Sequence, residues 1–226
     1  MAFATESGRL AQVAAETDDD AFARPTRCIP WTAGELLYHA QLGMARLERM
    51  LAEPEPAPEA RAALVTAPDY FRPGPRFSPA VDDDRVQSAR DGAAALGGAA
   101  ARARDFTRAR KQALGLLRAA SPARVVVTRH GDQMLLTEFT RTRVLELAVH
   151  GLDLADALNR QPWMTSSAAK VTEELLLPAE GAAARLRAAA GWDQVTLIAM
   201  LSGRAQPTRA EGRLIQSLGV RRLALG

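Results

Sequence analysis

The spacing of apolar residues along the chain predicts a protein built mainly of helices. In the segment PWTAGELLYHAQLGMARLERMLAEP, leucine and methionine side chains recur at helical spacing until Pro54 ends the run. The Thr32 hydroxyl can cap the amide of Glu35, and the Glu35 carboxylate can bond back to the Thr32 amide. This reciprocal pair predicts that a helix begins directly after Thr32.

Helical periodicity recurs in three other segments, which cover about 6–16, 85–120 and 140–159. The acidic triplet at 82–84 is interpreted as the cap of the second segment. Within that segment, Gly97 and Gly98 predict a kink or the close approach of another helix.

Two segments break the helical pattern. The proline-rich residues 53–79 predict a long irregular connection, whose aromatic side chains could cover an apolar cleft. Those aromatic residues are Tyr70, Phe71 and Phe77. The β-prone runs 125–128 and 134–137 flank the letters RHGD and predict a short hairpin.

These elements together predict a mainly α fold. We expect a helical bundle with a short β-hairpin over residues 1–162. The remainder, 163–226, contains further helical stretches and the apolar segment VTLIAMLSGR, and is expected to form a small C-terminal α(+β) domain or extension packed on the bundle.

The segment LELAVHGLDLADAL places three polar residues on a largely apolar helix. Glu146, His150 and Asp153 lie at positions i, i+4 and i+7, so their side chains share one face. The other faces carry leucine, valine and alanine, which predicts that much of the helix is buried, and a buried charge needs a partner or a metal. Glu146 and His150 could therefore supply two metal ligands, although a surface Glu–His pair has the same spacing.

A third ligand would have to come from a neighbouring helix. His39 lies seven residues after Thr32 in the predicted helix, and His130 lies in the predicted turn. Taken alone, His39 is more typical of a hydrogen-bonded core histidine than of a ligand.

Composition narrows the class of protein. The chain of 226 residues is 47% hydrophobic, enough for a sizeable core, and its net charge is only +3. Arginine is spread along the chain, which disfavours nucleic-acid binding. The apolar runs are too short to span a membrane, and we expect a cytoplasmic protein. The single cysteine, Cys28, excludes an internal disulfide and is expected to be a small buried side chain.

The two helix motifs together resemble the paired signatures of the DinB-like metalloenzyme superfamily, in particular its mycothiol-dependent maleylpyruvate isomerase branch. PWTAGELLYH is similar to the first signature, and RVLELAVHGLDLADAL, about 107 residues later, is similar to the second. The resemblance implies an up-down-down-up four-helix bundle in which His39, Glu146 and His150 bind a divalent metal, usually zinc. One departure is visible, because the branch commonly has Cys-Pro-Gly-Trp where this chain has Cys-Ile-Pro-Trp.

The resemblance also implies thiol chemistry. A metal with two histidine ligands and one carboxylate ligand favours a thiolate, and Cys28 is not a plausible nucleophile, so the thiol would be the cosubstrate mycothiol. The expected reaction is S-transfer to an electrophilic small molecule, or cis–trans isomerisation of one such as maleylpyruvate. Asp153 matches an acidic position of the family and could orient a ligand or bond a neighbouring helix.

Arg204 in LSGR is the preferred cation for holding an acidic or carbonyl group of the electrophile, because the family keeps an arginine in this part of the chain. A solvated arginine at a helix end is an equally good interpretation. Arg141 and Arg143 lie near the start of the predicted helix that carries Glu146 and His150, and they are weaker candidates. Tyr38 points about 100° away from His39 and is left out of the site.

Two other functions stay open. The same fold and metal could catalyse hydrolysis with water as the nucleophile, although no further His or Asp clearly serves as a general base. A non-enzymatic small-molecule-binding protein is the third possibility, which the intact ligand triplet disfavours. We expect neither a membrane nor a nucleic-acid partner, and either a monomer or a homodimer.

Overall fold

The computed structural model describes residues 2–60, 63–72, 78–177, 179–221 and 223, and most of them are helical. The four helices of the bundle are α1 (Ala2–Ala15), α3 (Ala33–Ala52), α6 (Ala99–Ala119) and α7 (Leu136–Ala157). The elements between them are α2 (Asp19–Phe22), the 3₁₀ helix η1 (Pro58–Ala60), α4 (Ala67–Tyr70), α5 (Pro79–Ala94), β1 (Val125–Val127) and β2 (Gln133–Leu135). The C-terminal part adds α8 (Ser166–Leu176), α9 (Ala182–Ala190), α10 (Gln194–Leu201) and α11 (Arg209–Ser217).

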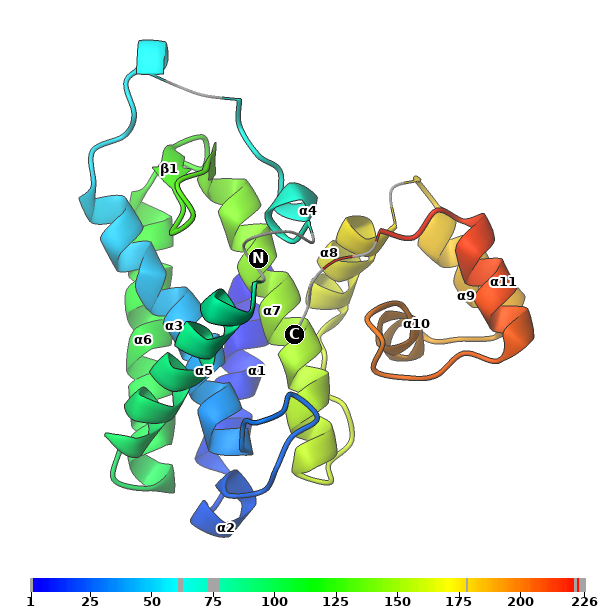
Figure 1. The fold of residues 1–226 in the computed structure, drawn as a ribbon, viewed down its shortest axis with the longest axis horizontal. Coiled ribbons are helices and arrows are strands. Elements are labelled where there is room, and N and C mark those ends of the chain that lie inside the picture. The colour runs from blue at the N-terminus through cyan, green and yellow to red at the C-terminus, as the bar shows by residue number, and fades with distance from the viewer. Residues whose placement is uncertain (1, 61–62, 73–77, 178, 222, 224–226) are drawn as a thin grey trace.

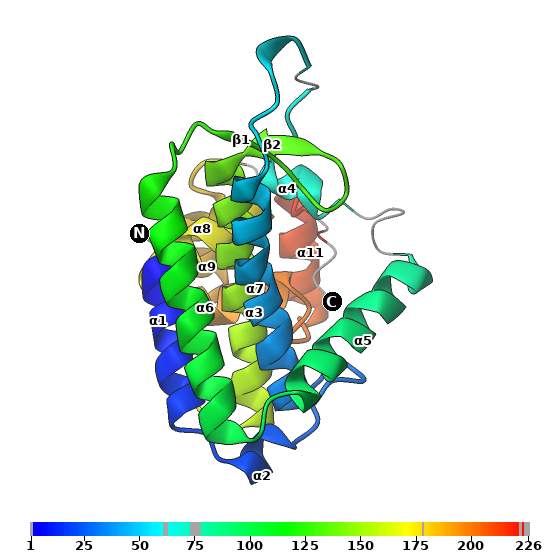
Figure 2. The same ribbon diagram turned by 90° about the vertical axis from the view of Figure 1, so that its left-hand side faces the viewer.

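The four bundle helices pack in a closed ring. Helix α1 contacts α6 and α7, and α3 contacts the same two helices from the other side. Helices α1 and α7 run in one direction and α3 and α6 in the other, and the long connection through α5 links the parallel pair (Figure 1). In the turned view α5 lies on the outer side of α3 (Figure 2). The predicted up-down-down-up bundle with a short hairpin is therefore confirmed.

Local sequence signals explain where the helices begin. The Thr32 hydroxyl accepts a hydrogen bond from the Glu35 amide, and the Glu35 carboxylate accepts one from the Thr32 amide, as predicted. The predicted cap at 82–84 is wrong, because α5 already begins at Pro79, and proline suits the first turn of a helix. The predicted kink is a complete break between α5 and α6, where Gly98 adopts a φ of +110° that glycine reaches without a clash.

The hairpin forms where it was predicted, with Val126 paired to Met134 in an antiparallel register. Its second strand is shorter than predicted, and α7 begins at Leu136 rather than near residue 140. The reason is that Leu136 and Phe139 are both buried, so the first turn of α7 already packs on the core.

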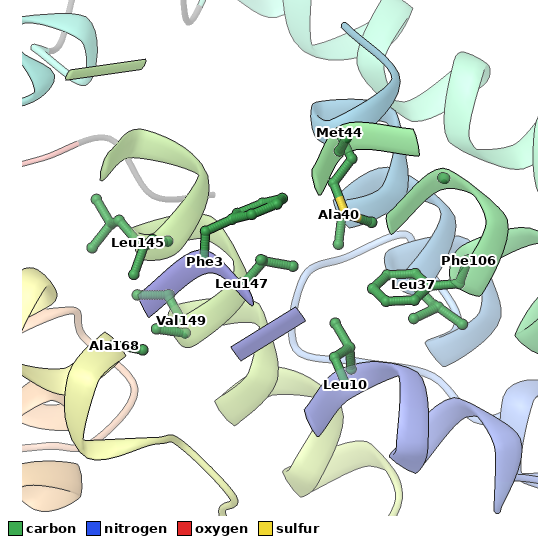
Figure 3. Packing of buried hydrophobic residues seen from close by; sticks show 14 of the residues in the cluster. Phe3, Leu10, Leu37, Ala40, Met44, Phe106, Leu145, Leu147, Val149 and Ala168 are labelled. Carbon is green, nitrogen blue, oxygen red and sulfur yellow. The ribbon is translucent and has the colours of Figure 1, made fainter. Parts of the chain in front are cut away.

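Buried apolar side chains from all four bundle helices fill its interior. Figure 3 shows Leu10 of α1, Leu37 of α3 and Phe106 of α6 in this cluster, together with several residues of α7. Tyr70 and Phe71 are buried in the same core, whereas Phe77 lies outside the described residues.

The C-terminal part packs on one side of the bundle. Helix α8 contacts α7 and α1, and α10 contacts α8 and α7. Glu6 of α1 accepts hydrogen bonds from the Thr165 amide at 2.9 Å and the Thr165 hydroxyl at 2.6 Å, which ties the start of α8 to the bundle. The division into 1–162 and 163–226 stays a prediction. No helix among the described residues is long and apolar enough to cross a membrane.

Candidate metal centre

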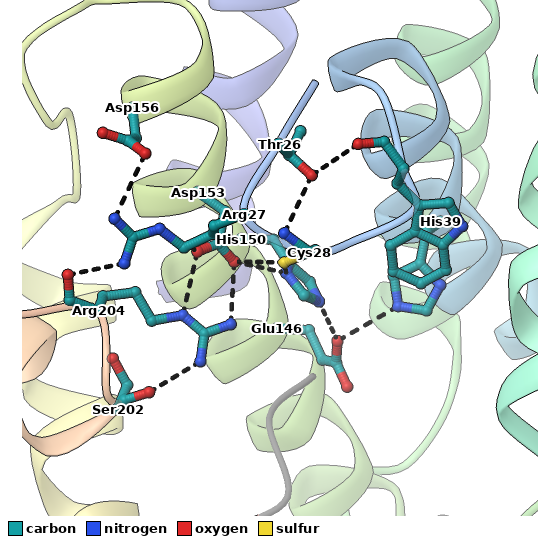
Figure 4. A network of polar contacts seen from close by, with 11 residues as sticks. Thr26, Arg27, Cys28, His39, Glu146, His150, Asp153, Asp156, Ser202 and Arg204 are labelled. Atoms are coloured by element: carbon teal, nitrogen blue, oxygen red, sulfur yellow. Dashed lines mark hydrogen bonds and ion pairs between the residues drawn. The ribbon is translucent and has the colours of Figure 1, made fainter. Parts of the chain in front are cut away.

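The antiparallel neighbours α3 and α7 bring His39, Glu146 and His150 together (Figure 4). The Glu146 Oε2 atom lies 3.2 Å from His150 Nε2 and 3.8 Å from His39 Nε2. The two imidazole rings have centroids 5.3 Å apart and are nearly perpendicular. One ligand atom from each residue lies within 4.8 Å of the others, so the three could share one ion.

Helix α7 is buried on most of its circumference, as the sequence predicted. The His150 side chain is only 4% exposed, whereas the Glu146 side chain is 22% exposed. The two residues are therefore not a pair on the solvated surface.

His39 is held in its neutral form. Burial lowers its pKa to about 4, although the neighbouring Glu146 carboxylate, 3.8 Å away, acts in the opposite direction. The Trp31 ring stacks on the imidazole at 4.5 Å between centroids. The Nδ1 atom is buried without a hydrogen-bond partner among the described residues, and the Nε2 atom faces Glu146. A neutral imidazole is the form that binds a metal.

Glu146 and His150 form a charged pair when no metal is bound. Burial by itself would raise the pKa of Glu146, but the neighbouring imidazoles of His150 and His39 hold it well below its ordinary value. Burial would likewise lower the pKa of His150, but its contacts with Asp153, Cys28 and Glu146 raise it well above its ordinary value. A metal would therefore compete with a proton on His150.

Asp153 contacts the far side of the His150 ring. Its Oδ2 atom lies 3.0 Å from His150 Nδ1. The Arg204 guanidinium donates to the same carboxylate twice, from Nε and from Nη2, each at 3.0 Å. Asp153 thus contacts a candidate ligand and also bonds the segment that follows α10.

Arg204 contacts Asp153, next to the candidate ligand His150, and its side chain is only 7% exposed. The interpretation as a solvated arginine at a helix end is therefore wrong, because the buried Asp153 carboxylate draws the guanidinium inward. Arg27 also donates to the Arg204 carbonyl at 2.7 Å. Arg141 pairs with Glu138 and Glu174 instead.

The family model for the mycothiol maleylpyruvate isomerase N-terminal domain matches residues 3–155. The chain belongs to this family. The match covers α1 to α7, and with them the three candidate metal ligands and Asp153. No curated protein and no solved structure matches the chain.

The sequence did not indicate that Cys28 belongs to this site. Cys28 is buried as predicted, but its Sγ atom also lies 3.2 Å from Asp153 Oδ2 and 4.0 Å from His150 Nδ1. Cys28, His150 and Asp153 therefore form a second group of potential ligands on the other side of the imidazole. The signal was the position of Cys28 in Cys-Ile-Pro-Trp, directly before the helix that carries His39.

Arg143 also lies closer to the candidate metal ligands than the sequence indicated. It was a weaker candidate than Arg204, yet it is 5% exposed and its Nη2 atom lies 3.8 Å from Glu146 Oε1. Its position three residues before Glu146 was visible in the sequence, but only the packing of α7 against α3 points it at the centre. Arg204, by contrast, lies beyond the part of the chain that the family model matches.

Proposed function

We propose that this member of the family is a metal-dependent thiol enzyme that binds a divalent ion such as Zn²⁺ through His39, Glu146 and His150. The observation that carries the proposal is the convergence of two imidazole nitrogens and one carboxylate oxygen between α3 and α7. Two histidines and one carboxylate hold zinc in catalytic sites that keep a further coordination position open.

The residues present fit such an ion. Ligand atoms held about 2.0–2.1 Å from a tetrahedral zinc lie roughly 3.3 Å from one another. The two separations measured from Glu146 Oε2 are 3.2 and 3.8 Å. The pKa of His39, lowered to about 4 by burial, keeps a ring nitrogen lone pair available at neutral pH.

When bound, the metal would lower the pKa of a coordinated thiol and keep it as the reactive thiolate. The chain's own residues orient the site. Asp153 accepts a hydrogen bond from His150 Nδ1, which leaves Nε2 of that ring to face the metal position. Arg204 holds the Asp153 carboxylate at two points, so we assign it to positioning Asp153 and His150. This role differs from the sequence-based expectation that Arg204 binds the electrophile.

The thiol in this proposal is mycothiol, and the second substrate is a small electrophile such as maleylpyruvate. The thiol adds across the activated double bond of the electrophile. The adduct is either kept as the S-conjugate or, after rotation about the new single bond, eliminates the thiol and leaves as the trans isomer. Family membership supports this choice. Cys28 does not supply the thiol, because its side chain is buried and its Sγ atom donates to Asp153.

Metal content tests the ligand assignment. We expect purified wild-type protein supplied with zinc to hold about one ion per chain, and His150→Ala to hold at least tenfold less because one ligand is lost. His130→Ala is the matched control, since it removes the chain's hairpin histidine and should keep the metal. Elemental analysis by mass spectrometry gives both numbers. Equal metal content in His150→Ala and wild type would overturn the assignment.

A second assay tests the reaction. The zinc form is incubated with mycothiol and either maleylpyruvate or a bimane, and isomerisation or thiol consumption is followed with time. We expect one of the two reactions with wild type and His130→Ala, and its loss in His150→Ala. A zinc-loaded protein that neither binds nor consumes mycothiol would contradict the thiol chemistry.

A further inference from the structure

The two helices that carry the metal triad also face one another nearer the hairpin. On α3 the residues His39, Gly43 and Arg46 follow one another at i, i+4 and i+7. On α7 the residues Arg143 and Glu146 lie at i and i+3, in the antiparallel direction. Helix α3 ends, and α7 begins, at the end of the bundle that carries β1 and α4 (Figure 1). Arg46 follows His39 on α3 and Arg143 precedes Glu146 on α7, so both lie between the triad and that end.

Gly43 makes room for Arg143 between the helices. A Cβ atom added at Gly43 would lie 2.7 Å from Arg143 Nη1, which is closer than real contacts allow. The guanidinium also lies 4.9 Å from the ring centroid of Phe139 and 5.6 Å from that of Tyr70. It is thus wedged between α3, α4 and the first turns of α7, against aromatic rings that favour a cation.

One end of the Arg143 guanidinium has no hydrogen-bond acceptor. Its Nε atom donates to the Thr142 hydroxyl at 3.0 Å. Its Nη2 atom is buried without a hydrogen-bond partner among the described residues, and the Glu146 carboxylate is 3.8 Å away, beyond hydrogen-bond distance. An unsatisfied charged donor inside a protein is costly, so this atom lacks the acceptor it requires.

Arg46 is close enough to Arg143 to be affected by its positive charge. It is half-buried on α3, and burial together with the positive charges of Arg129 and Arg143 lowers its pKa to about 10. It still carries its charge at neutral pH. Within the described part of the chain, Arg46 makes no hydrogen bond or ion pair. The negative charge of Glu146 acts against the positive charges of the arginines, but Glu146 is also the carboxylate of the proposed metal triad.

Several guanidinium groups that repel one another and share partial burial are stabilised by an anion. Guanidinium groups bind carboxylates through paired hydrogen bonds, and such bonds are strongest where water is excluded. We propose that Arg46 and Arg143 form a carboxylate-binding pocket beside the metal triad, which selects electrophiles that carry a carboxylate. This inference rests on the proposed function for its substrate, but the pocket itself requires neither metal nor thiol.

Binding of maleate to the metal-depleted protein tests the pocket, because no metal is then present to take up the carboxylate. Isothermal titration calorimetry compares maleate with its neutral diamide, maleamide. We expect wild type to bind maleate at least tenfold more tightly than maleamide. Arg46→Gln should weaken maleate binding at least tenfold and leave maleamide unchanged, and Arg46→Lys should recover part of the loss because it restores the charge.

Arg118→Gln is the matched control, since Arg118 is an exposed arginine on α6, and it should bind maleate like wild type. Thermal melts of each variant check that it is folded. Wild-type affinity in a folded Arg46→Gln variant would overturn the inference, as would inorganic phosphate binding more tightly than maleate. Failure of the thiol assay alone would count against the proposed function and not against the pocket.

Discussion

Asp153 is the residue on which the buried polar contacts converge. Its carboxylate is fully buried and contacts the candidate ligand His150, the Cys28 thiol and the Arg204 guanidinium. The charges of His150 and Arg204 hold the pKa of Asp153 well below its ordinary value, although burial itself opposes this. The carboxylate is therefore ionised throughout the physiological pH range, and its charge matters to both of its cationic partners.

Replacing Asp153 with Asn removes this charge while keeping the shape. We expect a loss of about 3–5 kcal/mol of unfolding free energy, because Arg204 is left buried without its counterion. We also expect metal affinity to fall roughly 10–100-fold, since His150 Nδ1 loses its orienting carboxylate. Urea denaturation and zinc titration measure the two effects.

Asp156→Asn is the matched control for this prediction. Asp156 lies on the same helix and pairs with Arg27 at 3.3 Å, but its side chain is 62% exposed. Surface pairs contribute about 0–1 kcal/mol, so the control should stay close to wild type. Equal effects of the two substitutions would contradict the central role of Asp153.

At the scale of elements, the site depends on two antiparallel helices whose ends are set by different signals. Helix α3 begins at its capping box and presents His39 to α7. Helix α7 has no side-chain cap, and its position comes from burial of its first turn and of most of its circumference. Local sequence therefore places α3, whereas tertiary packing places α7.

The capping box gives a prediction for α3. Thr32→Ala removes the acceptor for the Glu35 amide and should cost about 1 kcal/mol, which corresponds to roughly 2–4 °C in Tm for a chain of this size. Thr32→Ser keeps the acceptor and should stay within a few tenths of wild type. Thermal melts followed by circular dichroism measure both variants. A Tm for Thr32→Ala that equals that of Thr32→Ser would show that the cap contributes nothing.

At the scale of the whole molecule, the C-terminal segment completes the site that the bundle begins. Arg204 reaches Asp153 from beyond α10, and Glu6 of α1 binds the Thr165 amide and hydroxyl at the start of α8. These contacts join segments that are far apart in the sequence. The proposed metal ligands come from the bundle alone, but the Arg204 contact with Asp153 comes from the C-terminal segment.

Glu6 makes this connection sensitive to pH. Burial raises the pKa of Glu6 above its ordinary value of 4.5, although the Thr165 hydrogen bonds oppose the shift. The folded protein thus binds this proton more tightly than the unfolded chain, so stability is lost as pH rises from 4.5 through the folded pKa. Glu6→Gln keeps an acceptor for Thr165 but cannot ionise. We expect its urea midpoint, relative to wild type, to increase between pH 4 and pH 7.

Glu16→Gln provides the control for the pH series. Glu16 lies just after α1, and its side chain is 55% exposed. The Glu16→Gln profile should run parallel to that of wild type, whereas the Glu6→Gln profile should diverge from it. Parallel profiles for all three proteins would contradict a raised pKa at Glu6.

Sequence patterns were sufficient where neighbouring residues decide the outcome. The capping box placed the start of α3, the helical spacing put Glu146 and His150 on one face of α7, and the paired motifs led to the family. They failed at α5, where a proline signal outweighed the acidic triplet at 82–84. These features are local, because hydrogen bonds and side-chain sterics within a few residues determine them.

The sequence by itself determined the helices and the residue types of the triad, and the tertiary structure decided which side chains meet. The contacts of Cys28 and Arg204 with Asp153 join residues more than a hundred and about fifty positions apart, respectively. The pairing of Gly43 with Arg143 likewise depends on how α3 packs against α7. No local pattern encodes such contacts. Burial makes these polar contacts energetically important, and the residues become buried only once the helices are packed.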